Sequence, residues 1–268
     1  MSFDPKRPVS SIRDAARRRG IYLLPNLFTT AALFAGFYAV VAAMDGNFVQ
    51  AAIAIFVAMI LDGMDGRIAR LTSTESDFGM EYDSLSDMVS FGLAPALVVY
   101  QWGVARLQEY GWIWGKIGWL VAFLYAVAAA LRLARFNIQS STQTDKRYFV
   151  GMPSPSAAGV VAATVYGWPE RLAGPPEALA AVVVLLVPAF LMVSTVRFRA
   201  FKAVNFGWAR SPMPLFLFAI LIVFIFTEPR FALVVLAYGY LLSALVEWGL
   251  TRMRARRPAA PPAAPPSP

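Results

Sequence analysis

Long apolar stretches, separated by short polar connections, run through most of this chain. Each stretch is close to the roughly 20 residues that a helix needs to cross a bilayer. We therefore predict an all-α polytopic membrane protein of about eight transmembrane helices, a six-helix core plus two. The predicted spans are Leu24–Met44, Phe48–Arg70, Asp83–Trp102, Ile117–Arg135, Ser154–Trp168, Ala178–Val196, Met213–Thr227 and Phe231–Leu250. The fifth and seventh are short, so a count of six spans is the alternative.

The two ends of the chain differ from its apolar middle. Residues 1–22 are rich in Arg with apolar positions on one helical face, which predicts an interfacial helix; a solvated basic arm is the alternative. Residues 23–205 form the predicted transmembrane core, and residues 206–252 supply additional C-terminal helices. Residues 253–268 consist mostly of Pro and Ala and are predicted to be disordered.

The basic residues predict the orientation, because Lys and Arg gather in the cytoplasmic loops of membrane proteins. Of the 24 Lys and Arg residues, all but four fall in the two termini or in even-numbered connections. Both termini are therefore expected in the cytoplasm, with the chain in the inner (plasma) membrane. This bias and the attraction to anionic membrane lipids account for the net charge of +8 without a nucleic-acid partner.

Four carboxylates interrupt the apolar pattern at helical spacing. Asp62 and Asp65 stand three residues apart, and Asp83 and Asp87 stand four apart, so each pair projects from one face of its own helix. Ionisable groups in transmembrane segments are costly and by default indicate function. We predict that two facing helices hold the four acids around one site close to the cytoplasmic boundary.

The residue types limit the chemistry of that site. The chain has no Cys and no His, which excludes disulfides, thiolate nucleophiles and His-ligated zinc. A donor set made of carboxylate oxygens suits Mg²⁺ or Mn²⁺, and two such ions could assist a phosphoryl displacement. Neutralisation by Arg67 and Arg70 within helix packing is the alternative, but two cations do not balance four anions.

The same helix continues the acidic face with Gly66, Ala69 and Arg70. Small residues there would let a phosphorylated ligand approach the helix closely, and Arg70 is suited to anionic groups. On the next helix, Gly79 lies four residues before Asp83, just as Asp83 lies four residues before Asp87.

The order of these residues, Asp62-x-x-Asp65-Gly66-x-x-Ala69-Arg70 followed by Gly79-x-x-x-Asp83-x-x-x-Asp87, resembles the signature of the CDP-alcohol phosphatidyltransferase family. The resemblance implies a fold of at least six transmembrane helices, usually as a homodimer, in which the aspartates bind divalent metal above a CDP-linked lipid. It implies that Asp62 and Asp83 bridge two metals and that Asp65 binds one. It also implies that Asp87 binds the second metal and deprotonates the incoming alcohol.

The resemblance further implies a set of contacts to the CDP-linked lipid. The expected contact residues are Asn26, Thr29, Gly66, Ala69, Arg70, Ser76 and Gly79. Asn26 and Thr29 belong to a PNxxT element, and Asn26 is alternatively a helix cap.

Other segments resemble the membrane-integral phosphatidylserine synthases within this family, among them EYDSLSDMVSFGLAPA, ALRLARFN and GMPSPSAAG. The resemblance covers residues 20–205 and makes residues 23–205 the catalytic core. It implies transfer of the phosphatidyl group of CDP-diacylglycerol to L-serine, giving phosphatidylserine and CMP. Arg132 and Arg135 are candidate ligands of the serine carboxylate or a substrate phosphate. Ordinary snorkelling at the membrane boundary is the alternative for both.

Two other functions remain open from the sequence. The first is the same chemistry with another acceptor, choline or glycerol phosphate. The second is an ion-coupled transporter, since carboxylates within membranes also mark ion pathways. The absence of an evident inverted repeat and the position of the acids near the cytoplasmic boundary argue against the transporter.

Overall fold

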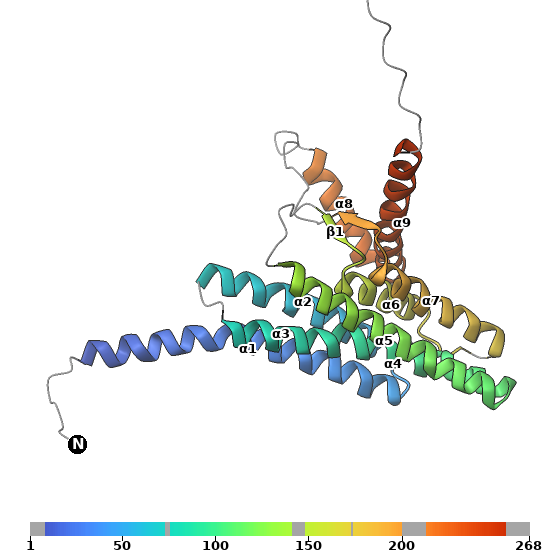
Figure 1. Ribbon diagram of the computed structural model, residues 1–268, viewed down its shortest axis with the longest axis horizontal. Coiled ribbons are helices and arrows are strands. Elements are labelled where there is room, and N and C mark those ends of the chain that lie inside the picture. The colour runs from blue at the N-terminus through green and yellow to red at the C-terminus, as the bar shows by residue number, and fades with distance from the viewer. Residues whose placement is uncertain (1–8, 73–75, 141–147, 173, 200–212, 256–268) are drawn as a thin grey trace, which may run out of the picture.

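A computed structural model describes residues 9–72, 76–140, 148–172, 174–199 and 213–255, and helices account for most of them (Figure 1). The all-α class is confirmed, with one short strand pair that the sequence analysis did not anticipate. The elements are α1 (Val9–Met44), α2 (Phe48–Thr72), α3 (Asp77–Asp87), the π-helix η1 (Met88–Leu93), α4 (Ala94–Trp102), the 3₁₀ helix η2 (Val104–Tyr110), α5 (Trp112–Ser140), β1 (Tyr148–Val150), α6 (Ser154–Gly167), α7 (Pro175–Val193), β2 (Arg197–Arg199), α8 (Met213–Thr227) and α9 (Pro229–Ala255).

The chain is an integral membrane protein. Within the described residues, five helices are long and apolar enough to cross a bilayer, or six if the bent segment Asp77–Tyr110 counts as one span. The two short predicted spans correspond to α6 and α8, of 14 and 15 residues. Helices of that length extend only about 21–23 Å, less than the roughly 30 Å hydrocarbon core. The count of eight spans therefore stays a prediction.

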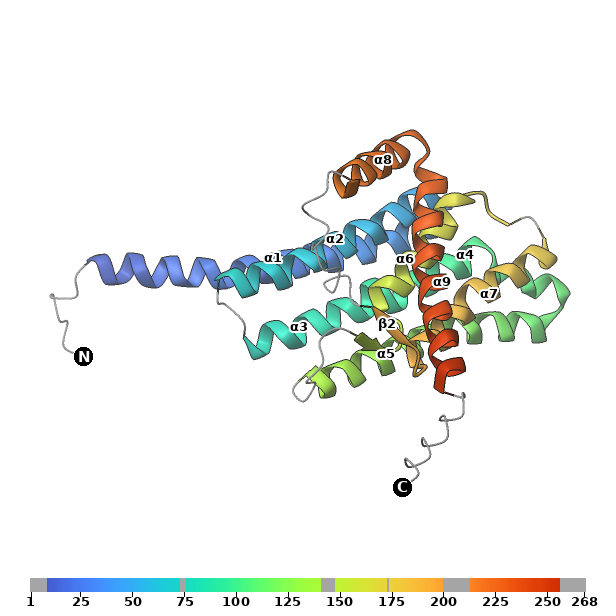
Figure 2. The ribbon, with the colours of Figure 1, turned by 90° about the horizontal axis from the view of Figure 1, so that it is seen from above.

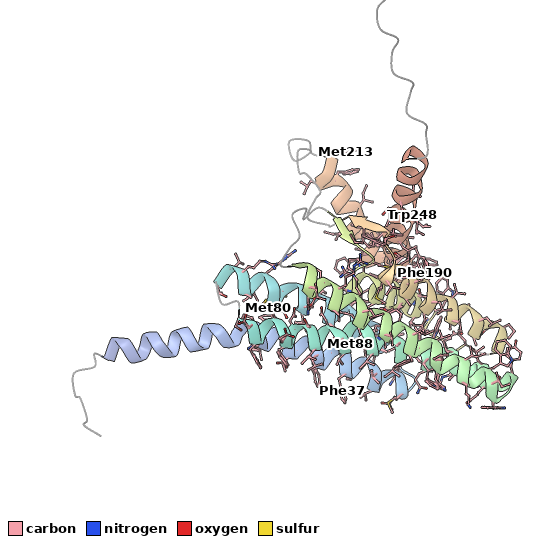
Figure 3. All side chains as sticks on the ribbon, in the orientation of Figure 1. Phe37, Met80, Met88, Phe190, Met213 and Trp248 are labelled. Carbon is pink, nitrogen blue, oxygen red and sulfur yellow. The ribbon has the colours of Figure 1, made fainter. Side chains whose placement is uncertain are left out.

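Apolar side chains cover the outer surface of the helices (Figure 3). Phe37 is 61% exposed and Phe190 is 72% exposed, although both lie in strongly apolar helices. In water such a surface would drive aggregation, whereas in a bilayer it meets lipid chains. The surface of the protein is thus consistent with its predicted membrane setting.

Helices α1 and α2 form a close antiparallel hairpin. Gly46 has a φ of 77° in the turn, a conformation that L side chains rarely adopt, and the Asn47 amide donates to the Ala42 carbonyl at 2.8 Å. Beyond the turn, Ala39 and Ala51 are fully buried. Small residues of this kind allow two membrane helices to approach closely. The hairpin therefore brings the N-terminal half of the membrane-spanning part of α1 beside the acidic end of α2.

A second set of contacts fastens α3 and η1 to α1. Ser86 of α3 donates a hydrogen bond to the Thr29 carbonyl, and Ser90 of η1 donates one to the Ala32 carbonyl, both at 3.1 Å. The helices touch at Gly36, where an added Cβ would lie only 2.7 Å from the Ser90 Cα. Any larger residue at position 36 would push η1 away from α1.

The π-helical turn η1 begins directly after Asp87. The Ala94 amide donates to the carbonyl of Val89, five residues earlier. Pro95 follows in the first turn of α4, and a proline lacks an amide hydrogen and crowds the carbonyl four residues before it. A wider turn before Pro95 relieves this crowding and lets one continuous rod pass from α3 to α4.

On the same side of the bundle as the acids, a two-stranded ribbon joins the segments that follow α5 and α7. β1 pairs antiparallel with β2, with Phe149 opposite Phe198. Gly151 ends β1 with a φ of 83°, and a Cβ at this position would lie 2.4 Å from the Met192 carbonyl oxygen. Only glycine fits there, because both the conformation and the space exclude a side chain.

Two parts of the chain extend beyond the α1–α7 bundle. Helix α9 packs against α6 and, with α8, rises from the bundle, and the N-terminal part of α1 projects beyond its neighbours (Figures 1 and 2). A hydrogen bond of 2.9 Å between the Thr164 and Tyr238 hydroxyls ties α9 to α6.

The segment predicted as an interfacial helix, residues 1–22, is helical from Val9 and runs into the first span without a break. Residues 1–8 and 256–268, including most of the predicted disordered tail, lie outside the described residues, and residues 253–255 belong to α9.

Candidate active site

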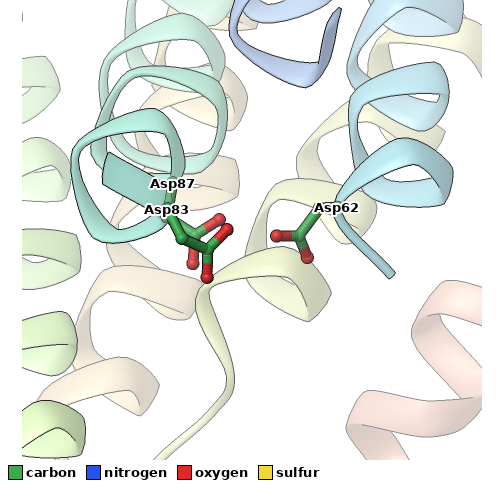
Figure 4. A group of neighbouring side chains, drawn as sticks. All are labelled: Asp62, Asp83 and Asp87. Atoms are coloured by element: carbon green, nitrogen blue, oxygen red, sulfur yellow. The ribbon is translucent and has the colours of Figure 1, made fainter. Parts of the chain in front are cut away.

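Three of the four predicted acids form a tight cluster between α2 and α3. Figure 4 shows Asp83 and Asp87 on one helix with their carboxyl groups directed toward Asp62 on the other. One carboxylate oxygen from each residue lies within 4.8 Å of the other two. The four-residue step places Asp83 and Asp87 on the same face of α3, as the sequence predicted. All three side chains are half-buried.

This cluster has the properties of a cation site. Three carboxylates this close repel one another unless a positive charge lies among them. Among the described residues, the Asp83 Oδ1 is buried and has no hydrogen-bond partner, although a buried carboxylate oxygen normally has one. A divalent metal would bind that oxygen, and a hard ion such as Mg²⁺ or Mn²⁺ prefers carboxylate ligands. The residues present therefore fit the divalent metal that was expected.

Asp65 has a different environment from the other three acids. It is only 4% exposed, and its Oδ2 accepts a hydrogen bond of 2.8 Å from the Thr29 hydroxyl of α1. It lies close enough to Asp83 for their charges to interact, but it is not part of the tight group of Asp62, Asp83 and Asp87. The ligand role expected for Asp65 stays a prediction.

A pocket of about 270 Å³ adjoins the acids and opens between α1, α2 and the start of α3. Its lining includes every residue expected to contact the CDP-linked lipid, together with two of the acids. The lining residues are Pro25, Asn26, Thr29, Asp65, Gly66, Ala69, Arg70, Ser76, Gly79, Met80 and Asp83. The structure thus brings together residues that are up to 58 positions apart in the sequence, from Pro25 to Asp83.

The structure shows which of two lining residues caps a helix. Ser76 is the N-cap of α3, and its hydroxyl accepts a hydrogen bond of 3.0 Å from the Gly79 amide. Capping therefore fixes Ser76 at the pocket wall whether or not a ligand is bound. The alternative of a cap at Asn26 is wrong, because α1 begins at Val9 and Asn26 lies well inside it.

Arg132 and Arg135 do not line this pocket. Arg132 is 6% exposed; its Nε donates to the Met152 carbonyl at 3.3 Å, and its guanidinium lies 5.4 Å from the Phe136 ring centre. Burial of this kind differs from simple snorkelling into the interface. One turn further, the Asn137 amide donates to the Ser84 hydroxyl at 3.0 Å, so the end of α5 rests on α3 next to Asp83.

A row of hydroxyls that was not predicted from the sequence fastens α3 and η1 to α1. Tyr82, Ser86 and Ser90 follow one another at four-residue steps, one position before the row of Gly79, Asp83 and Asp87. Tyr82 shares a hydrogen bond of 2.9 Å with Thr30, and the two serines donate to α1 carbonyls. The four-residue spacing of these hydroxyls was the signal for this second face.

A helical bundle with membrane-length apolar helices, an acid cluster and an adjoining pocket of about 270 Å³ that contains Arg70 is typical of a membrane enzyme that acts on phosphorylated substrates. The CDP-alcohol phosphatidyltransferase family model matches residues 22–193, and the chain belongs to this family. It is similar to the CDP-diacylglycerol–serine O-phosphatidyltransferase of Helicobacter pylori, with 38% identity over 233 residues, 85% of this chain and 92% of that protein. Proteins of the same name match in Mycobacterium tuberculosis, at 42% identity over 53% of this chain and 49% of the relative, and in Bacillus subtilis, at 35% over 50% and 70%.

The acid cluster predicts metal binding that depends on Asp83. We expect Asp83→Asn to weaken Mn²⁺ binding by about tenfold or more, since the loss of even an outer hydrogen-bond partner of a metal ligand typically costs that much. Electron paramagnetic resonance of free Mn²⁺ titrated with purified protein measures this. Asp77→Asn is the matched control, because Asp77 is an exposed acid on the same helix outside the cluster. Equal affinity of the Asp83→Asn and wild-type proteins would contradict the assignment.

Proposed function

We propose that this protein transfers the phosphatidyl group of CDP-diacylglycerol to the hydroxyl of L-serine. The serine oxygen forms a bond to the phosphorus that carries the diacylglycerol, and the bond from that phosphorus to the bridging diphosphate oxygen breaks. CMP leaves with the electron pair of the broken bond, and the serine hydroxyl proton passes to a base. The products are phosphatidylserine and CMP.

The observation that carries this proposal is the shared wall between the pocket and the acid cluster. Asp83 belongs to both, so a diphosphate held in the pocket would lie beside the carboxylates. Arg70 lines the same pocket and supplies a cation with forked donors for phosphate oxygens. The names of the relatives favour serine over choline or glycerol phosphate as the acceptor.

Each acid has a proposed role in this reaction. Asp62, Asp65, Asp83 and Asp87 are the proposed metal ligands, with Mg²⁺ or Mn²⁺ as the ion and two ions as the proposed number. Bound metal would neutralise negative charge on the diphosphate and on the departing CMP. Asp87 is the proposed base for the serine hydroxyl, as the family resemblance implies; it lies in the cluster, and the chain contains no His or Cys to serve instead.

The pocket residues have the task of holding the nucleotide end of the lipid. Gly66 presents open backbone to the pocket, because an added Cβ there would meet only the Arg70 guanidinium, at 3.6 Å. Ala69 and Gly79 also have small side chains or none and leave room for a ligand, while Asn26 and Ser76 offer polar groups. Fixing the diphosphate in this way lowers the entropic cost of bringing the acceptor in line with the phosphorus.

Serine is proposed to enter from the side of α5. Arg132 and Arg135 lie five and two residues before Asn137, whose hydrogen bond to Ser84 places this end of α5 against the acid-bearing helix. A guanidinium there is suited to the serine carboxylate. Because Arg132 is already bonded to Met152, the less buried Arg135 has more freedom to bind a ligand.

The proposed setting is the inner (plasma) membrane, with the acid cluster and both termini on the cytoplasmic side. This orientation rests on the distribution of Lys and Arg along the chain. Serine and CMP are water-soluble, so an active site at the cytoplasmic boundary would exchange both with the cytoplasm. A homodimer is proposed from the family resemblance alone.

The acceptor is tested directly with purified protein, CDP-diacylglycerol and Mn²⁺. We expect labelled serine to enter lipid, with CMP released in equal amount, and neither labelled choline nor labelled glycerol phosphate to do so. Chelation of the metal should abolish the transfer. Incorporation of another alcohol in place of serine would overturn the proposed acceptor while leaving the chemistry intact.

The base is tested by Asp87→Asn. We expect turnover to fall by about 10²–10⁴-fold, the usual contribution of general-base catalysis, while CDP-diacylglycerol still binds. Turnover is measured at increasing Mn²⁺, with lipid binding measured in parallel. Recovery of wild-type turnover at high Mn²⁺ would limit Asp87 to metal binding and remove it as the base.

The nucleotide pocket is tested by a pair of arginines on α2. Arg70 lines the pocket, whereas Arg67 is exposed on the same helix and does not. We expect Arg70→Gln to raise the KM for CDP-diacylglycerol about tenfold or more, because a charge-assisted hydrogen bond is worth about 1.5–3 kcal/mol. Arg67→Gln should leave this KM within twofold of the wild-type value. Similar effects of both changes would indicate a general surface charge rather than a specific contact.

A further inference from the structure

Thr29 connects all three helices that build the acid site. Its hydroxyl donates to the Asp65 Oδ2 of α2 at 2.8 Å, and its backbone carbonyl accepts from the Ser86 hydroxyl of α3 at 3.1 Å. The three side chains are at most 4% exposed. One residue of α1 is therefore bonded to an acid on α2 and to the residue that directly precedes Asp87 on α3.

Both hydrogen bonds are held in place by their surroundings. The Thr29 hydroxyl also lies 3.2 Å from the Pro25 carbonyl of its own helix, which restricts the rotation of the side chain. Ser86 is only 2% exposed, so its hydroxyl is largely shielded from competing water. The two bonds thus act as fixed spacers between helices.

The acids depend on such spacers because α3 packs mainly against α1, whereas α2 meets the same continuous helix chiefly further along, at η1 and α4. Helices α2 and α3 each pack against α1, which is the element they share. The carboxylates of Asp62, Asp83 and Asp87 repel one another, so without a cation the two helices tend to separate. A contact that holds both helices to α1 opposes that separation close to the acids.

We propose that Thr29 and Ser86 are positioning residues for the metal site. Thr29 fixes the carboxylate of Asp65, and Ser86 fixes the backbone of α3 next to Asp87, so that the acids are arranged for a divalent cation before it binds. This inference rests on the proposed metal-dependent function. It gives Thr29 a role separate from contact with the nucleotide, and it assigns a role to Ser86.

The chain contains its own control for this proposal. Ser90 makes the same type of hydrogen bond as Ser86, to an α1 carbonyl at the same 3.1 Å, and it is fully buried. It lies one turn further from the acids. If the serines only dock η1 and α3 onto α1, Ser86→Ala and Ser90→Ala should have the same effect.

The test compares Ser86→Ala, Ser90→Ala, Thr29→Val and Thr29→Ser in the full-length protein, without CDP-diacylglycerol. Mn²⁺ affinity is measured by electron paramagnetic resonance, and thermal unfolding is followed separately. We expect Ser86→Ala and Thr29→Val to weaken Mn²⁺ binding by about tenfold or more. Ser90→Ala and Thr29→Ser should bind within twofold of wild type, the latter because it keeps the hydroxyl. The absence of lipid separates this effect from a nucleotide contact of Thr29.

Three results would count against the inference, and each has a different meaning. If wild-type protein binds Mn²⁺, and Ser86→Ala and Ser90→Ala have the same Mn²⁺ affinity as each other, the two hydrogen bonds serve docking alone. The proposed function then survives. If wild-type protein binds no Mn²⁺, both the inference and the proposed metal-dependent function fail. A variant that unfolds at a lower temperature but keeps its Mn²⁺ affinity also counts against positioning.

Discussion

Electrostatic repulsion among closely spaced carboxylates sets the conditions that the rest of this structure has to meet. Asp62, Asp83 and Asp87 have oxygens within 4.8 Å of one another inside an otherwise apolar bundle. Such a cluster is unfavourable in a medium of low dielectric constant, both because each charge loses hydration and because like charges repel. The fold responds by fastening both acid-bearing helices to α1 and by leaving one carboxylate oxygen of Asp83 unbonded within the described part of the chain.

The packing on either side of the acids follows from the same requirement. Near the Gly46 turn, alanines let α1 and α2 approach closely, and the exposed Tyr38 hydroxyl adds a hydrogen bond of 2.8 Å to the Gln50 side chain. Close to the acids, hydroxyl groups of Thr29 and Ser86 replace the alanines as the means of contact. Hydrogen bonds have direction and set a distance, whereas apolar contacts alone allow helices to slide. The polar contacts are therefore placed where position matters most.

The helices and the acid pairs were predictable because both follow simple periodicities. Apolar stretches of membrane length located the helices, and the three- and four-residue steps placed Asp62 and Asp65, and then Asp83 and Asp87, on common faces. Helical spacing also placed Gly66, Ala69 and Arg70 on the acidic face of α2, but only the resemblance to a known signature linked them to Asn26, since Asn26 and Gly79 meet only in three dimensions. The hydrogen bond between Asp65 and Thr29 was not predictable, because its partner lies 36 residues away on another helix. The ribbon of β1 and β2 was missed for a related reason: strands of three residues are too short to show an alternating pattern.

The π-helical turn at Met88–Leu93 lies between α3, which carries the acids, and α4, which packs into the apolar core. A π turn holds about one residue more than an α turn, and each residue of an α-helix corresponds to a rotation of about 100°. The residues after the turn are therefore out of phase with those before it. This offset lets α3 direct its acids toward α2 while α4 turns Val98 and Trp102 into the apolar core. The helix face that serves chemistry and the face that serves packing can consequently change independently, provided that the length of this turn is kept.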